Sequence, residues 1–225
     1  MFLNESIPMF VGMSGGLVST VAAQVVQKSF SNFSGRRIIG QTLYDESQLH
    51  RVAVCETIAK DYGIEHSIAE VSPVEIQMKS FDTPYSVIED KVFRLVEDCL
   101  RQTQANPCSL FIGFSDEDKF DGASAQEVLN ELDVKTDHRV GVSGPCAACK
   151  LSDILIYAYR MNLLLPLRRS YYCHSPSFDP ERKSFRNCGE CPKCKRLKEC
   201  IAIAEECIQK RTPNPEMTKP FISKD

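Results

Sequence analysis

The chain has 225 residues, of which 43% are hydrophobic and 25% charged, and its formal net charge is −3 at pH 7. These values are those of a globular protein with one core, and they give no basic field for nucleic acid. No apolar run is long enough to span a bilayer, and no signal sequence opens the chain. Eleven cysteines in such a chain favour metal binding or reactive thiols over disulfides, so we expect a cytoplasmic protein.

The first predicted strand and helix are joined by a glycine-rich turn. An apolar run at residues 7–11 precedes Ser14-Gly15-Gly16-Leu17-Val18-Ser19-Thr20, and helical spacing follows from residue 18. Glycines allow positive φ and leave backbone N–H groups uncovered, while the helix adds its N-terminal partial positive charge. The turn is therefore a candidate cradle for phosphate or pyrophosphate, with an ordinary strand-to-helix turn as the alternative.

Strands and helices alternate along the next part of the chain. We predict further strands at residues 37–43, 66–71, 109–114 and 138–142, and helices at residues 18–29, 49–61, 86–102, 125–132 and 151–161. This order predicts a parallel, Rossmann-like α/β sheet with helices on both faces. Because ligands bind at the carboxyl ends of such strands, residues 13–16, 44–47 and 115–118 should meet at one cleft.

The cysteine pattern changes after residue 167. Cys188, Cys191 and Cys194 are spaced three residues apart, Cys173 lies upstream before a polar loop, and a helix is predicted at residues 194–209. Four such thiolates can hold a structural zinc ion; free thiols and an iron–sulfur cluster are the alternatives. We expect residues 1–167 to form a nucleotide-binding domain and residues 168–225 a zinc-binding segment packed on it.

The remaining cysteines give weaker signals. Cys146 and Cys149 form a pair before a predicted helix, and redox, metal-binding and inert roles all stay open. Four others are expected in the core on helical faces: Cys55, Cys99, Cys200 and Cys207.

Together these motifs resemble the PP-loop ATP pyrophosphatases, and most closely the QueC family of 7-cyano-7-deazaguanine synthases. The loop at residues 14–20 is similar to that family's Ser-Gly-Gly-Leu-Asp-Ser-Thr loop. The segment Tyr44-Asp45-Glu46-Ser47-Gln48-Leu49-His50 is similar to its Phe-Asp-Tyr-Gly-Gln-Arg-His segment. Gly113 with Glu117 and Asp118 resembles its Gly-Val-Asn-Ala-Glu-Asp turn, and Cys173, Cys188, Cys191 and Cys194 match its zinc ligands in order.

The resemblance implies an adenine nucleotide alpha hydrolase-like fold and an enzyme that uses ATP and Mg²⁺. Such an enzyme activates the carboxylate of 7-carboxy-7-deazaguanine as an adenylate, for conversion to an amide and a nitrile. Related members in antiviral defence settings are thought to join the deazapurine to other amines. A homodimer or a protein partner is also implied, without membrane or nucleic acid.

The resemblance also implies roles for particular residues. The implied catalytic residues are Ser14, Asp45, His50 and Lys150; the ATP-binding residues are Ser14, Gly15, Gly16, Leu17, Ser19 and Thr20; the substrate-binding residues are Gln48, Glu117 and Asp118; the zinc ligands are the four cysteines already named. For His50, and more strongly for His66, a structural histidine is the alternative.

The sequence also departs from the family pattern. Val18 stands where the loop of the family has Asp, and Tyr85-Ser86-Val87 falls where an Arg-Asn pair is thought to meet the nucleotide. A Tyr-Pro-Asp-Cys-Arg segment is replaced at residues 121–125, Lys150 lies one residue early, and the gap between Cys173 and Cys188 is longer. The acidic residues Asp45, Glu46, Asp116, Glu117 and Asp118 are candidates for a replacement metal site.

Three other functions stay open. The first is a non-catalytic scaffold subunit that binds a nucleotide or deazapurine. The second is a tRNA-thiolating enzyme with Cys146 and Cys149 as sulfur carriers. The third is a zinc-ribbon nucleic-acid module that uses the basic residues around the cysteines, namely Lys193, Lys195, Arg196 and Lys198, although a solvated face is the simpler reading of this charge pattern.

Overall fold

Five parallel strands form the central sheet of the computed structural model, which describes residues 7–30, 37–44, 49–70, 85–136, 139–173, 175–182 and 184–211. The strand order is β3-β2-β1-β4-β7, and each neighbouring pair is parallel. In that order the strands are Glu65–Glu70, Ile38–Tyr44, Met9–Gly12, Cys108–Phe111 and Val140–Ser143. The predicted parallel α/β sheet is confirmed.

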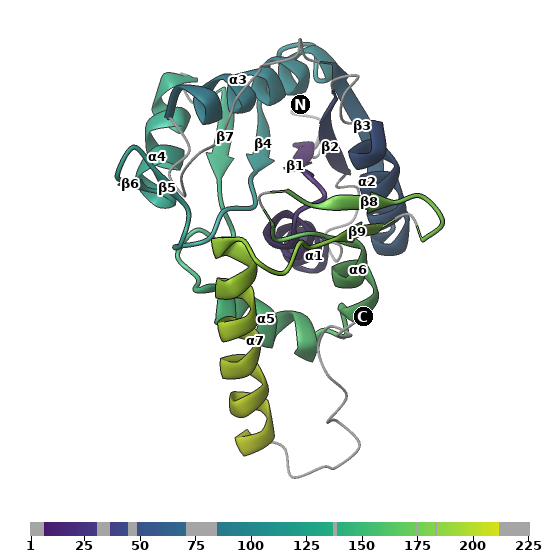
Figure 1. Cartoon of the computed structure of the whole chain (residues 1–225). Helices are drawn as coiled ribbons and strands as arrows, with labels where there is room; N and C mark the ends of the chain where they lie inside the picture. Colours follow the sequence, from purple (N-terminus) through teal and green to yellow (C-terminus); the bar gives the residue numbers. More distant parts are fainter. Residues whose placement is uncertain are drawn as a thin grey trace.

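Helices cover both faces of this sheet (Figure 1). One face carries α1 (Leu17–Phe30), α2 (Leu49–Tyr62) and α5 (Leu151–Arg160), and the other carries α3 (Tyr85–Gln102) and α4 (Ala125–Lys135). All five helices were predicted within a few residues, because each has apolar side chains recurring at helical spacing. Ser124 and Glu127 form a capping box that fixes the start of α4.

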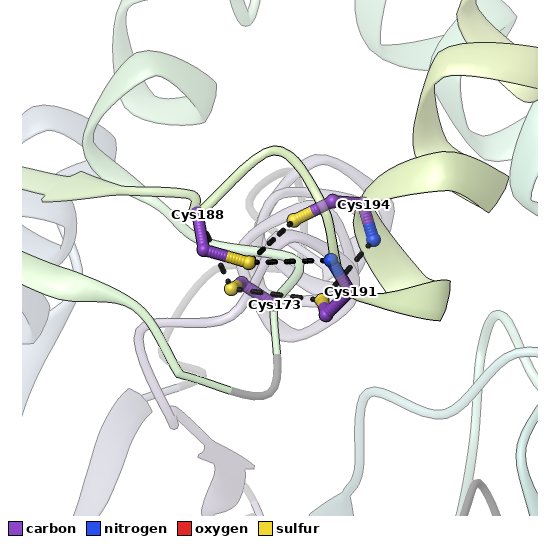
Figure 2. A group of neighbouring side chains, drawn as sticks. All are labelled: Cys173, Cys188, Cys191 and Cys194. Carbon is purple, nitrogen blue, oxygen red and sulfur yellow. Dashed lines mark hydrogen bonds between the residues drawn. The ribbon is translucent and has the colours of Figure 1, made fainter.

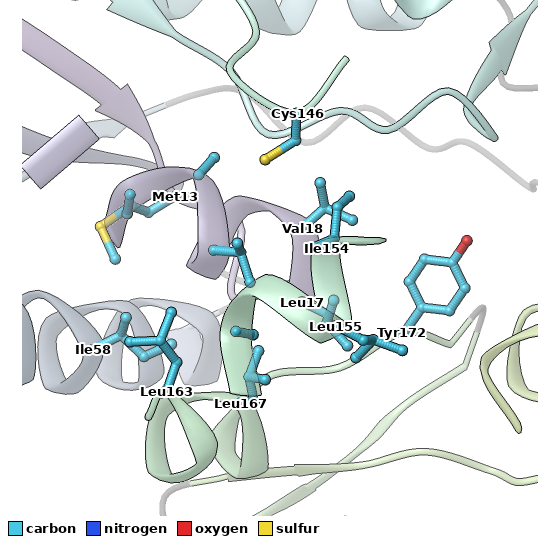
Figure 3. Close-up of a cluster of buried hydrophobic side chains, with 14 of the residues drawn as sticks. Met13, Leu17, Val18, Ile58, Cys146, Ile154, Leu155, Leu163, Leu167 and Tyr172 are labelled. Carbon is cyan, nitrogen blue, oxygen red and sulfur yellow. The ribbon is translucent and has the colours of Figure 1, made fainter. Parts of the chain in front are cut away.

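The central strand β1 contributes to a core on each side. Phe10 packs in the cluster with α3 and α4, whereas Val11 packs in the cluster with α1, α2 and α5. Figure 3 shows the second cluster, in which Leu17 and Val18 at the start of α1 lie close to Ile154 of α5. Because both faces of a parallel strand are buried, β1 is apolar throughout, and the turn that follows it rests on a rigid base.

The strand order reverses direction at β1. The chain passes from β1 to β2 and β3 on one side and then to β4 and β7 on the other. Loops that follow the two strands at such a reversal diverge and leave a crevice where ligands bind. The glycine-rich turn therefore lies at the topological switch point of the sheet.

The C-terminal part adds short elements that the sequence did not predict. After α6 (Leu164–Arg169) comes an antiparallel hairpin of β8 (Ser177–Asp179) and β9 (Ser184–Arg186), where we expected a loop. A second small hairpin joins β5 (Lys119–Phe120) and β6 (Ala123–Ser124). Two- and three-residue strands are too short for a period of two to be seen in sequence.

The final helix, α7 (Pro192–Arg211), packs along α5 and extends away from the sheet in Figure 1. Its side chains Leu197, Cys200 and Ala204 join the core that contains α1. The expectation that Cys207 is a core residue is wrong, because its side chain is exposed on the outer side of this helix. No helix in the described ranges combines the length and apolarity needed to cross a membrane. The division of the chain at residue 167 stays a prediction.

Candidate functional site

The turn after β1 has a backbone that requires glycine. Gly15 has a φ of +76°, in the left-handed region that side chains disfavour. A Cβ at this position would lie 3.3 Å from the Phe185 ring, 3.7 Å from the Tyr171 ring and 3.8 Å from the Cys55 sulfur. Both the conformation and the close surroundings therefore explain the glycine.

Small hydroxyl side chains hold the turn together from inside. The Oγ atoms of Ser14 and Ser19 are 3.0 Å apart, and the Gly16 N–H donates to Ser14 Oγ at 3.2 Å. The hydroxyls of Ser19 and Thr20 both donate to the Gly16 carbonyl at 2.9 Å. These bonds make residues 14–20 one compact turn, so the six predicted ATP-binding residues lie together.

Some backbone amides of the turn donate hydrogen bonds to other protein groups, and two others have no such acceptor. Leu17 N–H donates to the Tyr171 carbonyl at 2.8 Å, and Tyr171 N–H donates to the Gly15 carbonyl at 3.2 Å. In the part of the chain that the structure describes, the amides of Val18 and Ser19 have no such acceptor. An anion at the start of α1 would therefore meet these two N–H groups and the helix dipole.

The turn after β4 packs directly against this helix start. A Cβ on Gly113 would overlap Ser19 Cα and lie 2.6 Å from Ser19 N. Only hydrogen fits between the two backbones at this point. The predicted neighbourhood of the Gly-Gly turn and the segment after β4 is therefore present.

Two of the implied catalytic residues lie in the described part of α2 and α5. His50, in the first turn of α2, packs against Phe178 and Phe185 of the hairpin at ring distances of 5.3 and 5.4 Å. Lys150 is exposed and stands at the start of α5, where its side chain makes no capping bond. Asp45, Glu46 and Gln48 lie outside the described residues. The catalytic roles stay predictions.

Glu117 and Asp118, the implied substrate-binding residues, contact other parts of the chain. The Glu117 carboxylate accepts two bonds from Arg196 of α7, at 2.8 and 3.0 Å, and Glu117 raises the pKa of that guanidinium. Asp118 Oδ2 accepts from Ser115 N and Oγ at 2.8 and 2.9 Å. These bonds fix the turn after β4 and tie it to α7, and their role toward a substrate stays a prediction.

The pair Cys146 and Cys149 lies in a turn before α5. Burial raises the pKa of Cys146 to about 12. Burial, together with the nearby carboxylates of Asp153 and Asp116, raises the pKa of Cys149. Both thiols are therefore held protonated, which disfavours them as nucleophiles or sulfur carriers. His66, with a ring nitrogen 2.9 Å from Thr42 Oγ1, has a pKa lowered by burial and acts as a structural histidine.

Four cysteine sulfurs gather at the base of α7 (Figure 2). The Sγ atoms of Cys173, Cys188, Cys191 and Cys194 all lie within 4.8 Å of one another. The Cys173–Cys191 and Cys188–Cys194 sulfur pairs are each 3.8 Å apart. This grouping of residues distant in the sequence is what the spacing predicted, and the cluster can bind a metal.

The backbone around the cluster stabilises the thiolate form of Cys188 in particular. The N–H groups of Cys191 and Glu190 point at the Cys188 sulfur and lower its pKa to about 6. Cys173 Sγ also accepts from the N–H groups of Ser175 and Cys188, each at 3.4 Å. A turn that presents its amides to sulfur stabilises the deprotonated form that a metal requires.

The four-cysteine cluster and the glycine-rich turn are joined by the extended segment of residues 171–173. Gly16 and Tyr171 form a parallel β-bridge, and Cys173 follows two residues later. Tyr172 N–H donates to Asn187 Oδ1 at 2.9 Å, which ties the same segment to the residue before Cys188. The metal ligands therefore position the turn through the main chain.

Two side chains beside this turn were not predicted from the sequence, namely Tyr171 and Arg51. Arg51 lies with its guanidinium carbon 5.5 Å from the centre of the Tyr171 ring. The only available signal was that Arg51 directly follows the His50 of the matched segment. Nothing in the sequence links Tyr171 to residues 15–17, because the contact spans more than 150 positions.

The fold of the chain is similar to the folds of solved structures. The chain is similar to the U34-tRNA thiolase NcsA from Methanococcus maripaludis, whose structure includes its 4Fe-4S cluster, with 15% identity, a TM-score of 0.51, and coverage of 95% of this chain and 68% of that chain. The chain therefore shares the fold of this thiolase, a parallel sheet with helices on both faces. At this identity the likeness shows the fold and leaves the activity undetermined.

A weaker similarity connects the chain to the NH3-dependent NAD synthetase from Campylobacter jejuni subsp. jejuni NCTC 11168 in complex with nitrate. It has 11% identity and a TM-score of 0.43, over 96% of this chain and 82% of that chain, which is too low to support an argument. No family model and no curated protein matches the sequence. Within the PP-loop fold, the comparisons do not favour QueC over other members.

Proposed function

We propose that this chain binds ATP at the Ser14–Thr20 turn and uses it to activate a carboxylate by adenylation. The proposed substrate is an acid of the 7-carboxy-7-deazaguanine type, and the activated acid goes on to an amide or nitrile or is joined to another amine. The observation that carries the proposal is the turn itself, a glycine backbone at the switch point of a parallel sheet, in which the amides of Val18 and Ser19 have no backbone acceptor among the described residues. The substrate class rests on the sequence resemblance alone.

The proposed conversion of the acid to an amide has two chemical steps, and a nitrile needs a second activation by ATP that removes the amide oxygen. A carboxylate oxygen attacks the α-phosphorus of ATP, the bond from that phosphorus to the bridging oxygen breaks, and pyrophosphate leaves with the electron pair. An amine then attacks the acyl carbon and AMP departs. In the first step the amides of Val18 and Ser19 would offset the charge that builds on the leaving pyrophosphate, as fixed dipoles do at other oxyanions.

We propose zinc as the metal of the four-cysteine cluster, in a structural role. A tetrahedral ion with metal–sulfur bonds of about 2.3 Å places its ligands about 3.8 Å apart. The two shortest sulfur pairs have this separation. An iron–sulfur cluster such as that of the thiolase would hold the sulfurs farther apart, because its own irons and sulfides lie between them.

Magnesium fits the described residues less well. Val18 stands where the resembled family has the Asp of its loop, so it offers no carboxylate. Val18 is only 6% exposed and packs in the core from the first turn of α1. Within the described ranges, the four cysteines are the only group of three or more ligand side chains close enough to hold an ion. We therefore assign no step to a protein-bound magnesium ion.

A non-catalytic nucleotide-binding subunit is the second candidate. Its support is specific: Leu17 N–H is already bonded to Tyr171, and Val18 offers the nucleotide no side-chain ligand. Such a subunit would bind ATP at the same turn but would not release pyrophosphate. One experiment with two readouts separates the candidates.

The experiment combines calorimetry with product analysis. The chain is titrated with ATP in the presence of Mg²⁺, and then incubated with ATP, 7-carboxy-7-deazaguanine and ammonium while AMP and pyrophosphate are measured. Binding with product release supports the enzyme, binding without release supports the subunit, and absence of binding refutes both.

Matched glycine variants show whether the turn is the binding site. Gly15→Ala and Gly63→Ala both place a side chain at positive φ, at +76° and +66°, and so carry similar backbone strain. Gly63 has nothing within 4 Å of its Cβ position, whereas Gly15 faces the turn's neighbours. We expect Gly15→Ala to weaken ATP binding and Gly63→Ala to leave it unchanged.

A further inference from the structure

One partly buried cation beside the glycine-rich turn has a buried hydrogen-bond donor without an acceptor among the described residues. The Nε atom of Arg51 is buried, and it has no acceptor among the described residues. Buried N–H groups are nearly always paired, and an unpaired donor on a charged group is costly. Two other buried side-chain atoms of the described residues also have no hydrogen-bond partner, Tyr62 Oη and Asp116 Oδ1, and neither belongs to a cation.

The position of Arg51 is fixed relative to the turn through Tyr171. The guanidinium lies over the Tyr171 ring, and Tyr171 bonds to the turn through both its N–H and its carbonyl. Its hydroxyl is 3.5 Å from the Ser14 carbonyl, to which it donates. Tyr171 therefore contacts both Arg51 and the backbone of residues 14–17.

Helix geometry gives an independent placement. Arg51 and Cys55 are four residues apart on α2 and so lie on the same face. The Cys55 thiol donates to the Met13 carbonyl at 3.5 Å and lies 3.8 Å from the Cβ position of Gly15. This face of α2 is directed at the turn, with Arg51 one helical turn nearer to the N-terminus of the helix than Cys55.

Other guanidinium groups in this part of the molecule are occupied. Arg169 pairs with Asp61 at 2.6 Å, Arg186 with Asp179 at 2.8 Å and Arg196 with Glu117 at 2.8 Å. Arg51 forms no ion pair within the described residues. Arg51 is thus a cation that lies over an aromatic ring and has no ion-pair partner in the part of the chain that the structure describes.

The hairpin β8–β9 completes the surroundings of Arg51. Phe185 packs on Tyr171 at a ring distance of 4.8 Å and on Phe178 at 5.8 Å, and both phenylalanines contact His50. These rings therefore pack around Tyr171, the ring on which the guanidinium lies. A charge beside apolar rings interacts with an anion more strongly than it would in water.

We propose that Arg51 is a phosphate-binding residue, which contacts the polyphosphate of the nucleotide at the Ser14–Thr20 turn. This inference rests on the proposed function and adds a residue to it. The guanidinium would supply the cation on the phosphate side that residues 85–87 do not provide. A polyphosphate is the fitting ligand class because it accepts several N–H bonds at once from a planar guanidinium.

The test measures three ligands against four proteins by calorimetry with Mg²⁺ present. The ligands are ATP, AMP and inorganic tripolyphosphate, and the proteins are the unaltered chain, Arg51→Met, Arg51→Lys and Arg169→Met. Arg51→Met keeps much of the side-chain volume and removes the charge. Arg169→Met is the control, because it removes an arginine that is already paired with Asp61, a residue on the same helix as Arg51.

We expect Arg51→Met to weaken ATP and tripolyphosphate binding about 10- to 100-fold and AMP binding much less. Arg51→Lys should lose part of the affinity, and Arg169→Met none. Equal binding of ATP and tripolyphosphate by the unaltered chain and by Arg51→Met overturns the inference. If Arg51→Met fails to fold, the same criterion applies to Arg51→Lys.

The outcomes also separate this inference from the proposed function. ATP binding that does not depend on Arg51 refutes the inference and leaves the proposed function intact. Tripolyphosphate binding that depends on Arg51, without ATP binding, supports the inference and refutes the nucleotide. No binding of either ligand by the unaltered chain refutes both.

Discussion

Substitution of Gly113 by alanine tests whether the turn after β4 holds the start of α1. The new Cβ would overlap Ser19 Cα and lie 2.6 Å from Ser19 N and 3.0 Å from Ser19 Cβ. Non-bonded carbon atoms prefer separations of about 3.5–4 Å, so one backbone must move by about 1 Å. Both are main chain, and neither can escape by changing rotamer.

We expect the Gly113→Ala variant to unfold with a free energy lower by about 1–3 kcal/mol, the usual cost of overpacking. For a chain of this size that corresponds to a Tm lower by roughly 2–12 °C. ATP affinity should fall as well, because Ser19 carries one of the two amides of the proposed phosphate site.

The control is Gly141→Ala on β7, where the nearest atoms to the Cβ position, Cys108 O and Ser109 Oγ, are 4.0 Å away. Both variants restrict the unfolded chain in the same way, so their difference reports the contact with Ser19. Thermal melts and calorimetry measure the two effects. Equal Tm values for Gly113→Ala and Gly141→Ala would refute the reasoning.

Three further predictions concern the metal, one histidine and one helix cap. Removal of the metal with a chelator should lower the free energy of unfolding by about 4 kcal/mol if the metal was present at roughly 1000 times its Kd. Cys188→Ser should also lower the free energy of unfolding. A Tm that stays constant while elemental analysis shows metal loss would contradict this prediction. Because burial lowers the pKa of His66, the neutral form favours folding, so stability should be fully present above about pH 6.5 and should decrease as the pH falls through the lower folded-state pKa. His66→Gln should flatten the melting temperature against pH between about 5 and 7, and an unchanged profile would count against it. Ser124→Ala removes the acceptor for Glu127 N–H and should cost about 1 kcal/mol in urea unfolding, with Gln126→Ala as a nearby helix-surface control.

The parallel sheet and its helices could be predicted because their signals are local. Residues 9–12 form a buried strand of four residues, and 17–30 follow as a helix with apolar side chains at regular spacing. The grouping of Cys173 with Cys188, Cys191 and Cys194 was also predictable, since one chemistry explains all four. Local periodicity and ligand chemistry are both readable along one stretch of chain.

The surroundings of the turn could not be predicted, because they are made by tertiary contacts. The β-bridge between Gly16 and Tyr171 has no sequence signature, and neither does the packing of Phe185 on Tyr171. The roles of Glu117 in an ion pair with Arg196 and of Asp118 in a turn also depend on which side chains happen to be near. A carboxylate in a loop looks the same in sequence whether it binds a ligand or a neighbouring arginine.

In the proposed function, the arrangement would link a metal held by the four cysteines to a nucleotide at the turn that the metal does not touch. Residues 14–16 of the turn, a serine and two glycines, have little side-chain packing of their own, so much of their order must come from their neighbours. Tyr171 supplies two main-chain bonds to the turn and lies two residues before a metal ligand. Closing residues 173–194 around an ion restricts the same segment in advance. Loss of the metal should therefore weaken ATP binding at temperatures where the parallel sheet is still folded.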